Sequence, residues 1–328
     1  MQQWQPRQRR SRRYRWRSRF GHVRWGRVLV ALAGGAVLLF GLVKLIGYGV
    51  DLLSSHHTSE KLQTIYYADS TNEPILVAEA PVYTPVPTPV ETPVETATAM
   101  ASPTQSPIPR LPAVGYPGNP SLTVSSQFKA LRKESSYIVG WLSIHRMLDE
   151  AVVQRDNVFY LDHDVMGNSN VNGALFLDSA VKLENRPYTY IIYGHNMKTG
   201  AMFGSLRNYE NITFYHNDPF ITFDTMYETG RYVVFAVGVV SMEEWGENYV
   251  DFYALLSLSV PERAAAINSL IAASVYTCPV EVRIDDQLLL LVTCVEKDED
   301  RRVVVARRVR DGENEEELKK QVEKSVKR

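Results

Sequence analysis

An unbroken apolar segment constrains this chain more than any other feature of its sequence. Residues 28–50 contain no proline and only one charged side chain, that of Lys44. About 20 apolar residues span a bilayer core as a helix, and in hydrocarbon a helix satisfies all of its own backbone hydrogen bonds. We therefore expect residues 28–50 to form one transmembrane helix, with Lys44 near its end reaching toward the headgroups.

Charge is distributed very unevenly around this segment. Ten arginines lie in residues 1–27, and no aspartate or glutamate precedes Asp51. Such a block can bind nucleic acid, but beside a spanning helix it is typical of the cytoplasmic side of a membrane protein. The sequence thus predicts a single-pass protein of the cell membrane with a cytoplasmic N-terminus, an exported remainder and no nucleic-acid partner. A cleaved signal peptide is the alternative, disfavoured by the long basic region.

The exported part changes composition twice. Residues 51–120 begin as mixed sequence and then become rich in proline, threonine and valine. Proline fixes φ and removes a hydrogen-bond donor, so this region predicts an extracytoplasmic neck and an extended stalk. Residues 121–310 have a globular composition and are numerous enough for one domain with a sizeable core. The charged tail at residues 311–328 is typical of a solvated, frayed end.

Short strand-like runs dominate residues 121–310. Helices are expected only at residues 125–134, 201–208 and 261–274. Because strands and helices do not alternate, the pattern argues against a doubly wound sheet and favours a mainly β fold, a closed or nearly closed β-barrel with helical decorations. The strand-like runs lie at residues 137–144, 174–177, 190–193, 220–223, 232–240, 280–284, 288–293 and 303–309.

Cys294 stands at the end of the most apolar of these runs. On position alone, a free cysteine there is more often a small buried side chain than a nucleophile. Two arginines follow within ten residues, Arg301 and Arg302, and an antiparallel neighbouring strand would place one of them beside the thiol. The other cysteine, Cys278, lacks the partners of a zinc site, so we expect a free incidental thiol. A disulfide with Cys294 is the alternative, and it would consume the nucleophile.

His195 completes a chemically useful set. It follows the apolar run at residues 190–193, and the intervening Gly194 permits a tight turn. A neutral histidine at a strand end is well suited to exchange a proton near neutral pH. Cys294, His195 and one arginine would supply a nucleophile, a proton donor and a cation, which are the groups that acyl transfer needs.

The globular part resembles a class B sortase, a cysteine transpeptidase of Gram-positive cell surfaces. The most specific match is the stretch YGHNMKTGAMFGSL at residues 193–206. Shorter matches follow the family's order at residues 139–144, 160–164, 173–178, 291–294 and 301–307. The resemblance implies a sortase-like closed barrel over residues 121–310, preceded by one transmembrane helix.

The resemblance also implies roles for individual residues. His195 matches the family's catalytic histidine and Cys294 its nucleophile. Arg301 matches the catalytic arginine, with Arg302 as the alternative, because adjacent strand residues face opposite ways and only one can point at the thiol. Thr293 and Asn196 are expected to bind substrate.

The function implied is that of a membrane-anchored cysteine transpeptidase. It would cleave a sorting motif in exported proteins that carry a C-terminal sorting signal. The acyl group would then pass from a cysteine thioester to an amine of a peptidoglycan precursor or a pilin lysine. The alternatives are a surface cysteine protease that hydrolyses the same thioester, and a catalytically inert, stalked surface-binding domain.

No cofactor and no metal ion are expected. Two acidic pairs, Asp162 with Asp164 and Asp285 with Asp286, are potential ligands of a calcium ion. Both lack the ligand number and spacing of a recognisable calcium site, so surface turns are the simpler interpretation.

Overall fold

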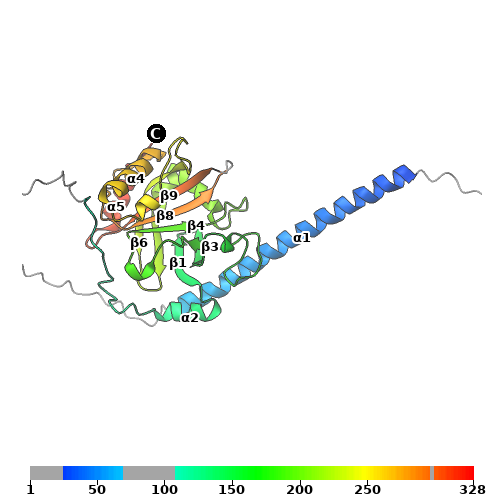
Figure 1. Cartoon of the computed structure of the whole chain (residues 1–328), viewed down its shortest axis with the longest axis horizontal. Helices are drawn as coiled ribbons and strands as arrows, with labels where there is room; N and C mark the ends of the chain where they lie inside the picture. Colours follow the sequence, from blue (N-terminus) through cyan, green and yellow to red (C-terminus); the bar gives the residue numbers. More distant parts are fainter. Residues whose placement is uncertain (1–24, 69–107, 296–298) are drawn as a thin grey trace, which may run out of the picture. The chain divides into compact units, whose positions relative to one another are not determined.

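The structure, a computed structural model, describes residues 25–68, 108–295 and 299–328. Within them, strands close into a barrel in the order β1-β2-β3-β4-β8-β9-β6-β5, with helices around it (Figure 1). The predicted mainly β fold with a closed barrel is confirmed. The barrel strands are β1 (Ile138–Ile144), β2 (Leu148–Val153), β3 (Leu175–Leu177), β4 (Thr189–Tyr193), β5 (Phe220–Thr225), β6 (Arg231–Ser241), β8 (Leu288–Cys294) and β9 (Asp300–Arg308).

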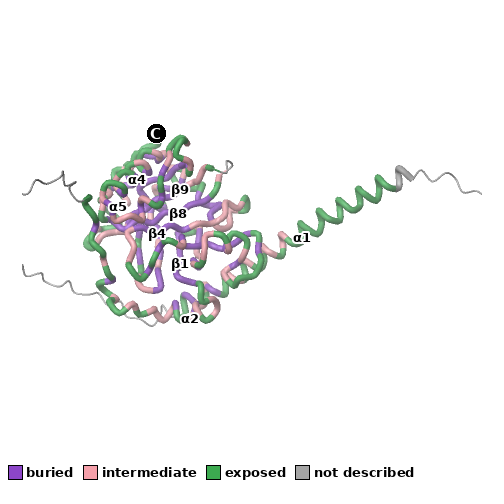
Figure 2. The backbone as a smooth tube through the Cα atoms, viewed as in Figure 1, coloured by how far each residue is buried: buried purple, intermediate pink, exposed green. Residues whose placement is uncertain are grey.

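β8 pairs with β4 on one side and with β9 on the other. Every residue of β8 before Cys294 is buried, and the buried residues gather in the barrel strands (Figure 2). One face of β8 looks into the filled barrel, and the 3-10 helix η3 (Phe203–Glu210) packs against the strand. A strand covered on both faces has a continuous apolar sequence instead of an alternating one, which explains the run of leucines.

The expected helices are present. α2 (Ser126–Glu134) begins after Ser125, whose side chain accepts a hydrogen bond from the Phe128 amide. α4 (Val260–Ala273) carries Pro261 in its first turn, where the missing N–H is not needed. The helix expected at residues 201–208 is η3, two residues further on. The other short elements are η1 (Phe159–Leu161), η2 (Leu183–Asn185), α3 (Ile212–Asn217), η4 (Tyr253–Leu255), β7 (Tyr276–Thr277) and β10 (Val326–Lys327).

The strand expected at residues 280–284 is not formed. The segment does alternate, since Val280 is buried and Glu281 is exposed, but side chains bind two of its backbone carbonyl groups. Arg307 Nε donates to the Glu281 carbonyl at 2.7 Å, and Arg263 Nε donates to the Ile284 carbonyl at 2.8 Å. A periodicity of two indicates which side chains are buried, whereas a strand also needs a neighbouring backbone.

The charged C-terminal tail is ordered, which differs from the frayed end we expected. α5 (Glu315–Val322) starts at Asn314, whose side chain accepts hydrogen bonds from the amides of the first turn. Leu318 and Val322, four residues apart, are buried on one face of the helix. β10 then pairs with β7. Apolar burial therefore outweighs the solvation of the surrounding charges.

α1 (Trp25–Ala68) is a single long helix. An 18-residue window within it has a mean hydropathy of 2.4, so the helix is long and apolar enough to cross a membrane. Residues 51–68, expected to be a neck, are helical and pack on the barrel. Tyr66 is buried there and stacks on Trp141 with ring centroids 4.4 Å apart. Residues 1–24 and the proline-rich segment 69–107 lie outside the described residues, and the domain boundaries at residues 120 and 310 stay predictions.

A partly buried carboxyl group at the contact between α1 and β2 predicts a pH-dependent stability. Ser59 of α1 donates to Glu150 Oε1 of β2 at 2.8 Å. Burial, only partly opposed by that hydrogen bond, raises the pKa of Glu150 from about 4.5 to about 7. Since the folded-state pKa is raised, the stabilisation by Glu150 is complete below its ordinary pKa and is lost as the pH rises through about 7. The loss amounts to roughly 3 kcal/mol at most.

Unfolding of the full chain in detergent by urea at pH 5 and pH 8.5 measures this effect. Glu150→Gln keeps the shape and cannot ionise, so the variant should lose less stability than the wild type over the same pH range. Equal losses in the two proteins would show that other groups cause the pH dependence.

Candidate active site

Cys294 is the last residue of β8 and the first exposed residue of that strand. The preceding residues are held in the barrel wall, so the thiol stands at the end of a rigid element. Cys294 is free of disulfide bonds. A side chain on such a support has a well-defined position.

The pairing of β8 with β9 distinguishes the two arginines. Cys294 lies opposite Arg301, and Thr293 lies opposite Arg302. Directly opposed residues share a face of the sheet, so Arg301 is on the face of the thiol and Arg302 is on the other. There, Arg302 Nε donates to Glu210 Oε1 of η3 at 2.7 Å. The geometry therefore favours Arg301 as the cation beside Cys294.

His195 reaches the same end of the barrel from β4. β4 runs parallel to β8, with Tyr193 opposite Val292, and the Gly194 amide extends this ladder to the Val292 carbonyl at 3.2 Å. His195 and Cys294 are each two residues beyond the last matched pair. Neighbouring strands are about 4.8 Å apart, so the two residues emerge side by side.

The surroundings of His195 determine its orientation. Its Nε2 forms a hydrogen bond with the carbonyl oxygen of Leu161 in η1. A carbonyl only accepts, so Nε2 carries a proton and Nδ1 is the nitrogen left for proton exchange. Gly194 allows the tight turn, since a Cβ there would lie 2.5 Å from Leu175 Cδ2 and 2.9 Å from Phe203 Cδ2.

Comparison with known proteins agrees with this geometry. The family model of the sortase domain matches residues 142–309, half of the chain. The chain belongs to the sortase family. Sortase B of Listeria monocytogenes is 32% identical over 181 residues, covering 53% of this chain and 70% of that protein. Sortase B of Staphylococcus aureus is 27% identical over 198 residues, covering 57% of this chain and 75% of that protein.

Solved structures give the same result. A Bacillus anthracis protein described as similar to sortase B aligns with a TM-score of 0.51 and 30% identity, covering 58% of this chain and 85% of that one. A complex of Staphylococcus aureus sortase B with substrate aligns with a TM-score of 0.52 and 27% identity, covering 58% and 87%. The chain is a class B sortase and hence a cysteine transpeptidase.

The two residues expected to bind substrate differ in their surroundings in this sortase. Thr293 is buried on the face opposite Cys294, and its hydroxyl has no hydrogen-bond partner among the described residues. Asn196 Nδ2 donates to the backbone carbonyl of Cys294 at 2.9 Å. Asn196 thus ties the turn after β4 to the end of β8. Roles in substrate binding for Thr293 and Asn196 stay predictions.

Cys278 is remote from Cys294. The Tyr215 hydroxyl lies 3.1 Å from Cys278 Sγ and 2.9 Å from the Val234 carbonyl oxygen. On β9, the residue opposite Val234 is five positions from the residue opposite Cys294, a separation of roughly 16 Å along the strand. A disulfide needs Cα atoms within about 7 Å, so the alternative of a Cys278–Cys294 bridge does not fit this sortase.

Sequence reasoning missed a partly buried hydrogen-bond network at the end of β4. Tyr193 donates to Asp178 Oδ2 at 3.0 Å, and Asn157 Nδ2 donates to the same oxygen at 3.2 Å. Burial and the Asp178 carboxylate raise the pKa of Tyr193, whereas the positive charge of Arg301 acts in the opposite direction. Arg301 is thus close enough to influence this pair. The only sequence signal was an aspartate directly after an apolar run.

One carboxylate of each acidic pair considered for calcium accepts hydrogen bonds from protein donors. Asp164 Oδ1 accepts from the amides of Met166 and Asn168, both at 2.9 Å. The Asp286 carboxylate accepts hydrogen bonds from Nε and Nη2 of Arg310, both at 2.7 Å. Over the described ranges, no group of three or more potential metal ligands occurs.

Proposed function

We propose that this sortase is anchored in the cell membrane and cleaves exported proteins within a sorting motif. The acyl group would then pass from a thioester on Cys294 to an amine. The observation that carries the proposal is the strand register, which brings Cys294 of β8, Arg301 of β9 and the turn with His195 after β4 to one end of the barrel. Its relative in Staphylococcus aureus is described in complex with a substrate, which supports a peptide donor for this chain as well.

In the first half-reaction, the Cys294 thiolate attacks a backbone carbonyl carbon of the sorting motif. The carbon–sulfur bond forms as the carbonyl π electrons move onto oxygen, and Arg301 on the same sheet face stabilises this negative charge. The tetrahedral species collapses, and the C–N bond breaks. The departing amine takes a proton from His195, whose Nε2 remains on the Leu161 carbonyl, so we assign the donated proton to Nδ1.

In the second half-reaction, an amine attacks the thioester and releases the Cys294 thiolate. Neutral His195 accepts the proton lost by the attacking nitrogen, which restores the starting state. The acceptor is an amine of a peptidoglycan precursor or a pilin lysine. If water attacked instead, the enzyme would be a protease, and if no thioester formed, the domain would only bind.

The location follows from the N-terminal sequence and α1. The apolar helix is long enough to span a bilayer, and ten arginines precede residue 28. The excess of positive charge favours a cytoplasmic N-terminus and a catalytic domain on the outer face. The thiol would then meet proteins as they leave the membrane.

Trapping the acyl-enzyme tests this function. The full chain in detergent is incubated with a library of sorting-signal peptides, and intact mass with peptide mapping locates the adduct. We expect one acyl group on Cys294 and its transfer to an added amine. An adduct that yields only free acid would identify a protease, and the absence of any adduct across the library would favour the binding domain.

A further inference from the structure

Residues 51–55 of α1 contact the segment that lies behind His195. We call residues 159–174 the backing segment. Asp51 Oδ2 accepts a hydrogen bond from the Val171 amide at 3.2 Å, and the Asp51 carbonyl accepts from Asn170 Nδ2 at 3.1 Å. Ser55 Oγ accepts from Asn172 Nδ2 at 3.0 Å. Helix α1 thus holds three consecutive residues of the backing segment.

Those residues in turn hold the carbonyl that contacts His195. The Asn170 amide donates to the Asp162 carbonyl at 2.9 Å, and the Ala174 amide donates to the Tyr160 carbonyl at 3.0 Å. These two bonds flank Leu161, whose carbonyl oxygen bonds His195 Nε2. The position of the Leu161 carbonyl therefore depends on residues 170–174 on both of its sides.

Gly173 adds a direct contact between the backing segment and the imidazole. Its φ of +61° is in the left-handed region, and a Cβ there would lie 2.5 Å from the Tyr160 carbonyl oxygen and 3.1 Å from His195 Cδ2. The backbone of residue 173 therefore packs closely against one side of the ring. A shift of residues 170–173 would move the ring as well as its hydrogen-bond acceptor.

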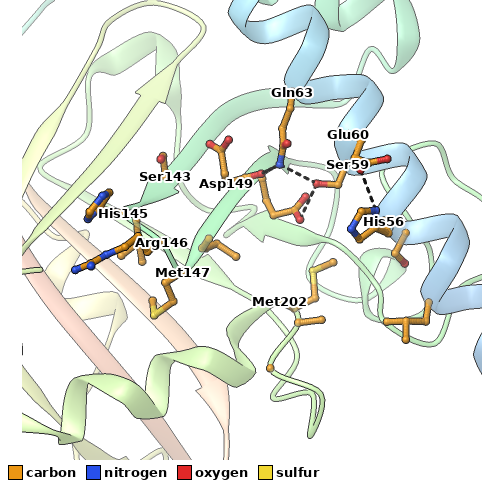
Figure 3. A pocket seen from close by; sticks show the side chains of 17 residues that line it. His56, Ser59, Glu60, Gln63, Ser143, His145, Arg146, Met147, Asp149 and Met202 are labelled. Carbon is orange, nitrogen blue, oxygen red and sulfur yellow. Dashed lines mark hydrogen bonds and ion pairs between the residues drawn. The ribbon is translucent and has the colours of Figure 1, made fainter. Parts of the chain in front are cut away.

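The side of α1 that faces β2 is less tightly packed. A cavity of about 620 Å³ lies between α1 and the turn that joins β1 and β2 (Figure 3). Ser55 and Met202 also line this cavity, and Met202 pairs with Asn196 in the turn after His195. On this side, Ser59 bonds Glu150 and Gln63 Nε2 bonds the Asp149 carbonyl, both on β2 (Figure 3). Among the described residues, the hydrogen bonds that join α1 to the backing segment come from Asp51 and Ser55.

We infer that Asp51 and Ser55 are positioning residues for His195, acting through residues 170–173 and the Leu161 carbonyl. The inference rests on the proposed role of His195 as proton donor. By this route, the helix that continues the apolar segment selects the Nε2–H form of the imidazole and leaves Nδ1 for the reaction. Neither residue touches the substrate or the reacting atoms.

The full chain in detergent, labelled with ¹⁵N-histidine, tests the inference with three variants. The double variant Asp51→Ala/Ser55→Ala removes both side-chain contacts, Ser55→Thr keeps the hydroxyl, and Ser54→Ala makes the same kind of change at the exposed neighbouring position. His195→Gln identifies the His195 signals. The spectra are recorded at a pH at which the imidazole is neutral, because the imidazolium that donates the proton has no tautomers. There, we expect the wild type, Ser55→Thr and Ser54→Ala to show a protonated Nε2, and the double variant to show a mixture of tautomers.

Acylation kinetics supply the second readout. In the double variant, kcat for acylation should fall about tenfold, as the loss of one or two hydrogen bonds predicts, with the KM for the sorting peptide unchanged. Unchanged imidazole signals together with unchanged kcat would overturn the inference. If the double variant fails to fold, Ser55→Ala alone gives the same comparison with a smaller effect. Full acylation by His195→Ala would instead refute the proposed role of His195.

Discussion

Cys294→Ala is expected to abolish the acyl-enzyme and to lower transpeptidation by a factor of roughly 10⁴ or more, because the attacking atom is removed. Cys278→Ala is the matched control. Its sulfur lies beside the Tyr215 hydroxyl, away from the end of β8, so the turnover of this variant should remain close to that of the wild type. Intact mass detects the adduct, and release of a labelled leaving peptide measures the rate.

The pair of cysteine variants also separates chemistry from folding. Cys294 is exposed, so its truncation leaves the apolar core intact and the thermal unfolding temperature should change little. If Cys294→Ala still forms a covalent adduct with the sorting peptide, the nucleophile is a different residue. If Cys278→Ala loses as much activity as Cys294→Ala, the two thiols act together in a way that their separation does not explain.

Arg301→Ala should reduce kcat for acylation by about 10²- to 10³-fold, the loss typical of removing one stabilising donor from a developing oxyanion. Arg302→Ala should cost less than about tenfold, because it removes a partly exposed ion pair with Glu210 on the other face of the sheet. The reduction in kcat for Arg301→Lys should lie between those of the two alanine variants, since an ammonium keeps the charge but lacks the planar set of donors.

Single-turnover kinetics with a fluorogenic sorting peptide separate these variants. The comparison is a test of the β8–β9 register. A larger loss for Arg302→Ala than for Arg301→Ala would mean that the hairpin shifts by one residue when substrate binds. Equal, small losses would mean that backbone amides stabilise the oxyanion without an arginine.

The apolar runs predicted most of the barrel, and the turn after residue 193 predicted the histidine. The choice between Arg301 and Arg302 was not accessible from the sequence. Six residues separate Cys294 from Arg301, and a shift of one residue in the pairing would exchange the faces of the two arginines. The pattern of apolar and polar residues changes little under such a shift at a strand end, so only the observed pairing distinguishes them.

Other differences have the same origin in long-range contacts. The segment 280–284 alternates like a strand, but arginine side chains bind its carbonyls. The sequence of residues 51–68 does not indicate which part of the chain they contact. In the structure, their side chains pack on β1 and bond to β2. The acceptor for His195 is the backbone carbonyl of Leu161, and backbone groups carry no sequence signal.

The parallel pairing of β4 with β8 has a consequence for biosynthesis. Nearly one hundred residues separate His195 from Cys294, and they become neighbours only when this pair of strands forms. Contacts of such sequence separation form slowly, because a long loop must close before they provide any stabilisation. Before the barrel closes, Cys294 therefore has neither His195 nor Arg301 beside it. The three side chains come together only at barrel closure, so a chain that is still folding does not yet carry the assembled site.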